Sequence, residues 1–266
     1  GEPGKATRAA VGRGRLVCEE HDSCRIEGLT QIWEQSRDAA RTGHYSHRIA
    51  FSPDGGHLFI SSGDRQEMSP AQDLSNTLGT VVRLNLDGTP AADNPFASRG
   101  APTDQIWSYG HRNVLGLAFD AQGQLWEIEH GPKGGDELNR VDRGANYGWP
   151  VRSDGVHYNG DPIPDHSSDD GFAKPAISWD PVIAPGGMIF YGGDMFADWQ
   201  DQLLVANLAT TSISRIVTNA AANSATEEAR YDFPRRLRDI AQAPDGAIWV
   251  IEDKEGGRLL RLTPAS

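Results

Sequence analysis

Four stretches of this chain repeat one pattern: a hydrophobic strand, a turn centred on Asp-Gly or a similar pair, and a second strand. They read HRIAFSPDGGHLFISSGD (47–64), GLAFDAQGQLWEIEHG (116–131), GGMIFYGGDMFADWQDQLLVANL (186–208) and RDIAQAPDGAIWVIED (238–253). Each is followed by a shorter strand that sets a basic residue beside an apolar one: VVRLNL from Val81, LNRV from Leu138, ISRIV from Ile213 and LLRL from Leu259. A hairpin plus outer strand that recurs in this way is typical of the blades of a β-propeller.

The chain is therefore predicted to be all-β, a single propeller domain over residues 1–266. The 30 glycines and 16 prolines agree with many turns and few helices. Residues 42–266 hold four blades, and residues 1–41 are the tail of a preceding blade followed by an irregular loop. Residues 151–175 and 219–234 have loop composition. A β-sandwich built from similar hairpins is the alternative.

Charge and hydropathy exclude two classes of partner. The formal net charge is −12, and no Lys/Arg stripe interleaved with aromatics occurs, so a nucleic acid partner is not expected. No apolar run approaches the roughly 18 to 20 residues that span a bilayer, and the first fifteen residues lack the apolar segment of a signal peptide. The sequence predicts no membrane span and no signal peptide in this stretch.

Cys18 and Cys24 are the only cysteines, and a short polar loop separates them. Such a pair can form a disulfide, remain as two free thiols, or provide half of a metal site that includes His21. A disulfide is the simplest interpretation, and it would indicate an oxidising compartment.

The segment EHGPKGGDELNRVDRGANYGWP, which ends at Pro150, has the composition of a cation-binding loop. Glycines around Gly131 and Pro132 let the backbone turn tightly, so that carbonyl oxygens can face a hard cation while Asp136 and Glu137 offer carboxylates. The segment does not follow the EF-hand pattern, and a solvated acidic turn is the alternative.

Two groups of cationic residues are candidate ligand contacts. Arg112 and Asn113 directly precede a strand, where side chains at a blade's inner edge face the central channel. A buried arginine needs a carboxylate or an anionic ligand. Arg236 and Arg238 alternate on one face of a strand and suit a polyanionic ligand, although a salt bridge to Asp239 or another neighbour is the alternative.

His44 stands in the turn that enters the first complete blade. An imidazole in a pocket can act as a general base at neutral pH. His47, His111 and His130 compete for this role, and a structural or surface role is the alternative for each.

Six stretches resemble the soluble glucose and aldose sugar dehydrogenases that depend on pyrroloquinoline quinone (PQQ), also called the glucose/sorbosone dehydrogenase family. They are GHYSHRIAFSPDGGHLFISSGDR, AQDLSNTLGTVVRLNLDGTPAADNPF, IWSYGHRNVLGLAF, EHGPKGGDELNRVDRGANYGWP, IAPGGMIFYGGDMF and RLRDIAQAPDGAIWVIED. They run in family order from about residue 42 to the end. The resemblance implies a six-bladed propeller, of which this chain holds blades three to six and the tail of blade two.

The resemblance also implies roles for residues. His44, first in the His-x-x-x-Arg pattern that ends at Arg48, is similar to the family's catalytic base, and Asp136 is similar to the acid that supports the base or the adjacent arginine. Arg112 and Asn113 are similar to the residues beside the quinone carbonyls, Arg236 and Arg238 to the clamp on the cofactor's carboxylates, and Gly131 and Pro132 to the calcium ligands. Two departures are Ala209, where some members have a lysine, and Val182, where a hydroxyl residue is usual.

By this resemblance, the chain is expected to oxidise aldose sugars to lactones with PQQ and calcium and to pass electrons to an external acceptor, in the periplasm or after secretion. A calcium-dependent lactonase and a non-catalytic binding module are the alternatives. Exposed strand edges also predict association between copies of the chain.

Overall fold

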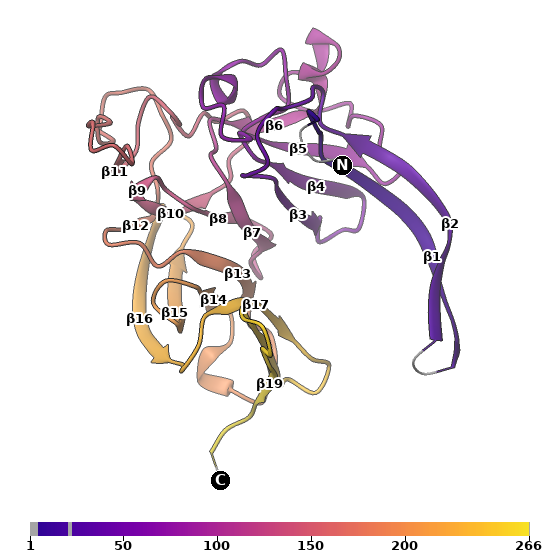
Figure 1. The fold of residues 1–266 in the computed structure, drawn as a ribbon, viewed down its shortest axis with the longest axis vertical. Coiled ribbons are helices and arrows are strands. Elements are labelled where there is room, and N and C mark those ends of the chain that lie inside the picture. The colour runs from indigo at the N-terminus through magenta and orange to yellow at the C-terminus, as the bar shows by residue number, and fades with distance from the viewer. Residues whose placement is uncertain (1–4, 21–22, 266) are drawn as a thin grey trace.

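The computed structural model describes residues 5–20 and 23–265, and these form sheets arranged as propeller blades (Figure 1). The four repeats become four successive antiparallel sheets, so the predicted all-β class and blade pattern are confirmed. The first sheet contains β3 (Ser46–Phe51), β4 (His57–Ser62), β5 (Thr80–Asn85) and β6 (Ile106–Tyr109). The second contains β7 (Val114–Phe119), β8 (Leu125–Glu129), β10 (Asp136–Arg140) and β12 (Ile177–Trp179).

The other two sheets follow the same order. The third contains β13 (Pro185–Phe190), β14 (Leu203–Asn207), β15 (Ser212–Asn219) and β16 (Ser224–Asp232). The last has three strands among the described residues, β17 (Leu237–Gln242), β18 (Ile248–Glu252) and β19 (Leu259–Leu262). In every sheet the short basic-apolar segment is the third strand, as the repeat predicts.

One loop prediction was wrong. Residues 219–234 contain the strand β16, which pairs along its length with β15. Along β16 exposed side chains alternate with half-buried ones, so the strand has the polar composition of a loop. An outer strand can present polar side chains to water while its backbone completes the sheet. Residues 151–175 are largely loop, with only the short β11 (Gly155–Val156) pairing with β9 (Lys133–Gly134).

The core lies between neighbouring blades. The innermost strands β3, β7, β13 and β17 pack side by side in that order. Apolar clusters join the first sheet to the second through Phe59 and Leu117, and the second to the third through Trp126 and Met188. Strands β8 and β14 are buried along their whole length because blades cover both of their faces.

Arg48, on β3, connects three inner strands. Its guanidinium lies 2.9 Å from the carboxylate of Asp239 on β17 and donates a hydrogen bond to the carbonyl of Gly186 on β13. The first and last blades of the described chain therefore meet through one side chain.

A long hairpin precedes the blades, formed by β1 (Ala10–Glu20) and β2 (Ser23–Glu34), and it curves away from the body (Figure 1). Its base is anchored because Trp33 packs into the first blade's core with Leu58 and Ile60. The leading segment is thus two long strands and more regular than expected.

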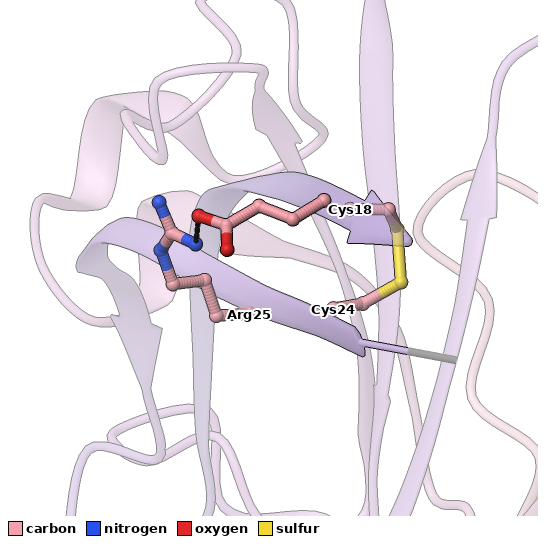
Figure 2. Close-up of a disulfide and its surroundings, with 4 residues drawn as sticks. Cys18, Cys24 and Arg25 are labelled. Atoms are coloured by element: carbon pink, nitrogen blue, oxygen red, sulfur yellow. Dashed lines mark hydrogen bonds and ion pairs between the residues drawn. A yellow bond between two sulfur atoms is a disulfide. The ribbon is translucent and has the colours of Figure 1, made fainter. Parts of the chain in front are cut away.

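A disulfide joins Cys18 and Cys24 near the tip of this hairpin (Figure 2). The free-thiol interpretation is therefore wrong, and because both sulfur atoms are bonded to each other, so is the metal site. His21, the third expected ligand, lies outside the described residues. Among the helices of the described residues, none has the length and apolar character needed to cross a membrane.

Candidate active site

His44 and Arg112 line one cavity of about 190 Å³. His44 comes from the loop before β3, and Arg112 from the turn before β7. Trp149 and Tyr158, from the long loop after β10, form part of the wall, and Pro132 lies beside them. The structure therefore brings the predicted base and the predicted arginine together, although they are far apart in the sequence.

Asp64 orients the imidazole of His44. Its Oδ1 lies 2.7 Å from His44 Nδ1 and accepts a hydrogen bond from the backbone N–H of Gln66, while its Oδ2 accepts one from Trp149 Nε1. A carboxylate only accepts, so Nδ1 of a neutral His44 carries the proton and Nε2 is the basic nitrogen. Asp64 is fully buried, which fixes this geometry.

Sequence reasoning missed Asp64. In an antiparallel hairpin, the residues before the first strand lie beside those after the second, and Ser46 pairs with Ser62 at that end of β3 and β4. Asp64 follows β4 directly, so hairpin register was the signal that placed it next to His44. Asp136, which the resemblance assigned to support the base or the arginine, instead accepts hydrogen bonds from the backbone N–H groups of Gly131 and Ala184.

Gly63 permits the close approach of the two loops. A Cβ at this position would lie 1.9 Å from the carbonyl oxygen of His44. His44 itself has a left-handed backbone, with φ 48°. Any side chain at residue 63 would displace the His44 loop.

The competing histidines are held by other contacts. His111 is fully buried. His130 Nε2 donates to the carbonyl of Pro185. Burial first, and then the positive charges of Arg112, His44 and Arg238, lower the pKa of His130 to about 4. Burial also lowers the pKa of His47 to about 4. Of these four histidines, His44 alone lines the cavity with Arg112.

Arg112 is a buried cation without a partner carboxylate. Its side chain donates to the carbonyl of His130 and to the hydroxyl of Tyr158, and its guanidinium lies 5.2 Å from the centre of the Trp149 ring. Its buried Nε has no hydrogen-bond partner. Among the described residues, no carboxylate forms an ion pair with the Arg112 guanidinium within 4.0 Å. A guanidinium in this setting favours an anionic ligand.

Asn113 and Asp136 are structural neighbours of the cavity. The Asn113 side-chain oxygen accepts a hydrogen bond from the Ser46 backbone N–H, which ties the Arg112 turn to the His44 loop. Asp136 accepts hydrogen bonds from the backbone N–H groups of Gly131 and Ala184. Burial raises the pKa of Asp136 to about 6, and these N–H groups oppose the rise.

Arg236 and Arg238 do share one face, as predicted, and both contact Asp253, at 3.2 Å and 3.0 Å. They do not line the cavity of His44. Asp239, which the sequence offered as their partner, pairs with Arg48 instead. Arg238 is nevertheless close enough to His130 for its charge to add to the lowering of the pKa of His130, which burial mainly causes.

Comparison with known proteins decides the family. The family model described as Glucose / Sorbosone dehydrogenase matches residues 1–261. The chain belongs to the glucose/sorbosone dehydrogenase family. It is 36% identical over 270 residues to the aldose sugar dehydrogenase YliI of Escherichia coli, an alignment that covers 99% of this chain and 71% of that protein.

Solved structures agree with this assignment. The soluble aldose sugar dehydrogenase of Escherichia coli in its apo form superposes with a TM-score of 0.87 at 35% identity, over 96% of this chain and 74% of that one. The PQQ-bound form of an aldose sugar dehydrogenase from Streptomyces coelicolor gives 0.71 at 27% identity, over 94% and 71%. The predicted family and the propeller fold are therefore confirmed.

The two departures from the glucose/sorbosone dehydrogenase pattern lie close together. Ala209 donates its backbone N–H to the carbonyl of Ile183, the residue after Val182. Ala184, which follows Ile183, donates to Asp136. Both departures therefore adjoin a segment that shares a hydrogen-bond acceptor, Asp136, with Gly131.

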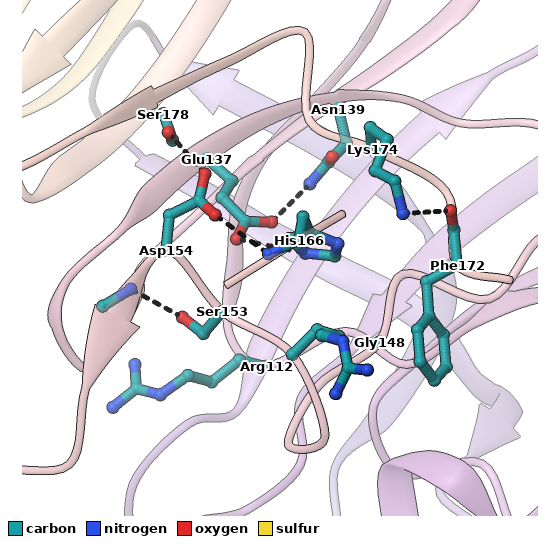
Figure 3. Close-up of polar contacts among 12 residues, drawn as sticks. Arg112, Glu137, Asn139, Gly148, Ser153, Asp154, His166, Phe172, Lys174 and Ser178 are labelled. Atoms are coloured by element: carbon teal, nitrogen blue, oxygen red, sulfur yellow. Dashed lines mark hydrogen bonds and ion pairs between the residues drawn. The ribbon is translucent and has the colours of Figure 1, made fainter. Parts of the chain in front are cut away.

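The loop implied to hold calcium in this family has suitable donors. Carbonyl oxygens of Gly134 and Gly135 crowd Gly131, at 2.3 Å and 2.1 Å from the place of a Cβ. Beside Gly131 and Pro132 is a cavity of about 10 Å³, which is room for one water or ion, and Glu129 and Glu137 also line it. Figure 3 shows Glu137 with Asn139 and Arg112 in this region. Oxygen donors of this kind fit a hard cation.

Proposed function

We propose that this chain oxidises aldose sugars at the anomeric carbon to lactones, using PQQ and calcium. The observation that carries the proposal is the buried, carboxylate-free guanidinium of Arg112 in the same cavity as the His44–Asp64 pair. An anion site next to an oriented base is the combination that a dehydrogenase with an acidic cofactor requires. The PQQ-bound relative from Streptomyces coelicolor supports the choice of cofactor.

The proposed binding residues are those assigned by family resemblance. Arg112 and Asn113 would hold the quinone end of PQQ, Arg236 and Arg238 would hold its carboxylates, and the carbonyls of Gly131 and Pro132 would hold calcium. When bound, PQQ supplies a hydride acceptor and calcium supplies Lewis-acid polarisation.

The chain's own residues supply proton transfer and charge stabilisation. His44 Nε2 takes the proton of the anomeric hydroxyl, and Asp64 stabilises the resulting imidazolium through Nδ1. Arg112 stabilises negative charge that develops in the cavity. Trp149 and Tyr158 form part of the cavity wall beside these groups.

Reconstitution tests the proposal. The protein is stripped with EDTA, incubated with PQQ and Ca²⁺, and assayed for a bound quinone spectrum and for glucose-dependent reduction of a dye, which replaces the external electron acceptor. Both signals are expected. PQQ binding without dye reduction by any aldose would indicate the binding module, and lactone hydrolysis without PQQ would indicate the lactonase.

The proposed location is the periplasm or the extracellular space. The Cys18–Cys24 disulfide supports it, because disulfides persist in oxidising compartments.

A further inference from the structure

The turn that carries Arg112 rests on a buried charged cluster. His111, directly before Arg112, is fully buried, and its Nδ1 lies 3.5 Å from Glu127 Oε1 and 3.6 Å from Glu129 Oε1. Its Nε2 contacts the Ser108 hydroxyl at 2.8 Å, and its ring stacks on Tyr147. These contacts leave the imidazole no access to the cavity.

The His111 imidazole lies between the two carboxyl groups of this cluster. Among the described residues, no lysine or arginine side chain forms an ion pair with Glu127 or Glu129 within 4.0 Å. Burial lowers the pKa of His111, but the two carboxylates outweigh burial and raise it to about 9. Glu137, on β10, adds a further carboxyl group to the same region.

The two glutamates differ in what else they contact. Glu129 Oε2 accepts the backbone N–H of Arg112 at 2.5 Å and that of Asn113 at 3.1 Å. Glu127 Oε1 instead accepts the side-chain amide of Asn139 at 2.7 Å. Both glutamates lie on β8 and are buried, so they form a matched pair in which only Glu129 bonds to the backbone of Arg112 and Asn113.

We propose that Glu129 is a positioning residue that fixes the backbone of Arg112 and Asn113 for cofactor binding. One carboxyl oxygen of Glu129 accepts both backbone N–H groups, so it holds the two consecutive residues of the turn in one orientation. Because a small misplacement of a contacting side chain weakens binding and catalysis strongly, fixing this turn matters for function. This proposal rests on the proposed function for its consequence, but not for the contact itself.

The test compares Glu129→Gln with Glu127→Gln in the full chain. Each removes one carboxylate beside the same imidazole, so both are expected to lower Tm. Only Glu129→Gln is expected to raise the Kd for PQQ, at saturating Ca²⁺, by tenfold or more and to lower kcat. Glu127→Gln is expected to leave both within about threefold. Glu129→Asp, which keeps the charge but withdraws the oxygens, is the second variant if Glu129→Gln fails to fold.

A readout that needs no cofactor separates the two proposals. Amide hydrogen exchange of the peptide spanning residues 110–113 is measured in the protein without PQQ. Faster exchange in Glu129→Gln, with the wild-type rate in Glu127→Gln, supports the positioning role. Equal exchange in both variants would overturn it, whether or not the wild-type chain binds PQQ. A wild-type chain that fails to bind PQQ would remove the proposed function and leave the exchange result to decide the positioning role.

A double-mutant cycle tests the part played by His111. If His111 acts through Glu129, His111→Gln added to Glu129→Gln produces no further change in exchange at residues 110–113. Additive effects would show that His111 holds the turn independently and would contradict this step.

Discussion

His44 Nδ1 and Asp64 Oδ1 lie 2.7 Å apart, and this contact joins the loop before one strand of the first blade to the loop after the next. It fixes the tautomer of His44 and directs Nε2 to proton transfer. The same carboxylate holds Trp149, so the base and one wall of the cavity share an anchor.

Replacing the base should affect turnover and spare binding. His44→Ala is expected to lower kcat by about two to four powers of ten, the usual contribution of a general base, while the Kd for PQQ changes little. Steady-state dye reduction and PQQ titration measure the two quantities. Unchanged turnover would reassign the base.

Asp64 should act through His44. Asp64→Asn keeps the size of the side chain but no longer holds Nδ1–H with a carboxylate, so kcat is expected to fall by about tenfold or more. The pH profile of kcat should shift as well, because the imidazolium loses its stabilising charge. Asp87→Asn, on an exposed turn, is the control. An unaltered pH profile in Asp64→Asn would limit Asp64 to a structural role.

Replacing Arg112, whose guanidinium has no carboxylate partner, should weaken PQQ binding without lowering the stability of the fold. Arg112→Met leaves no carboxylate without a partner, and it removes a charge whose burial is costly. Tm is expected to hold or to rise, whereas the Kd for PQQ rises at least tenfold. Thermal melts and PQQ titration check both. A large drop in Tm with unchanged affinity would show that Arg112 is structural.

The last blade should respond to acid through Glu252. Hydrogen bonding from Arg258, opposed by burial, lowers the pKa of Glu252 from 4.5 to about 2. Because the pKa of Glu252 is lower in the folded state, its ionised carboxylate stabilises the fold at pH values above its ordinary pKa. This contribution is lost as the pH falls from about 4.5 through about 2. Urea midpoints at pH 5 and pH 3 should therefore differ more in the wild type than in Glu252→Gln. Glu255→Gln, on the exposed turn nearby, should behave like the wild type.

Association between copies stays a prediction with a physical basis. Leu16, Ile26, Leu29 and Phe51 are exposed and line a groove of about 500 Å³ between the hairpin and the first blade. Apolar surface of this kind favours contacts. Light scattering over a range of concentrations should show a rising mass, and Leu29→Ser/Phe51→Ser should reduce it. A constant monomer mass in the wild type would refute association.

The sequence alone determined the blades, and it predicted the residues of the candidate site. Strand periodicity and turn residues are local properties, so the hairpins around His57 and Ile248 and the tight loop at Gly131 could be read directly. The strand β16 escaped because an outer strand tolerates polar side chains.

Only the tertiary structure decided which side chains meet. Asp64 reaches His44 through hairpin register, Asp253 pairs with Arg236 and Arg238, and Glu129 binds the turn at Arg112 from the next strand. Composition cannot distinguish one carboxylate from another, because the partner of a charge depends on how separate segments are brought together. Burial then sets the strength of each contact, and burial is a property of the assembled blades.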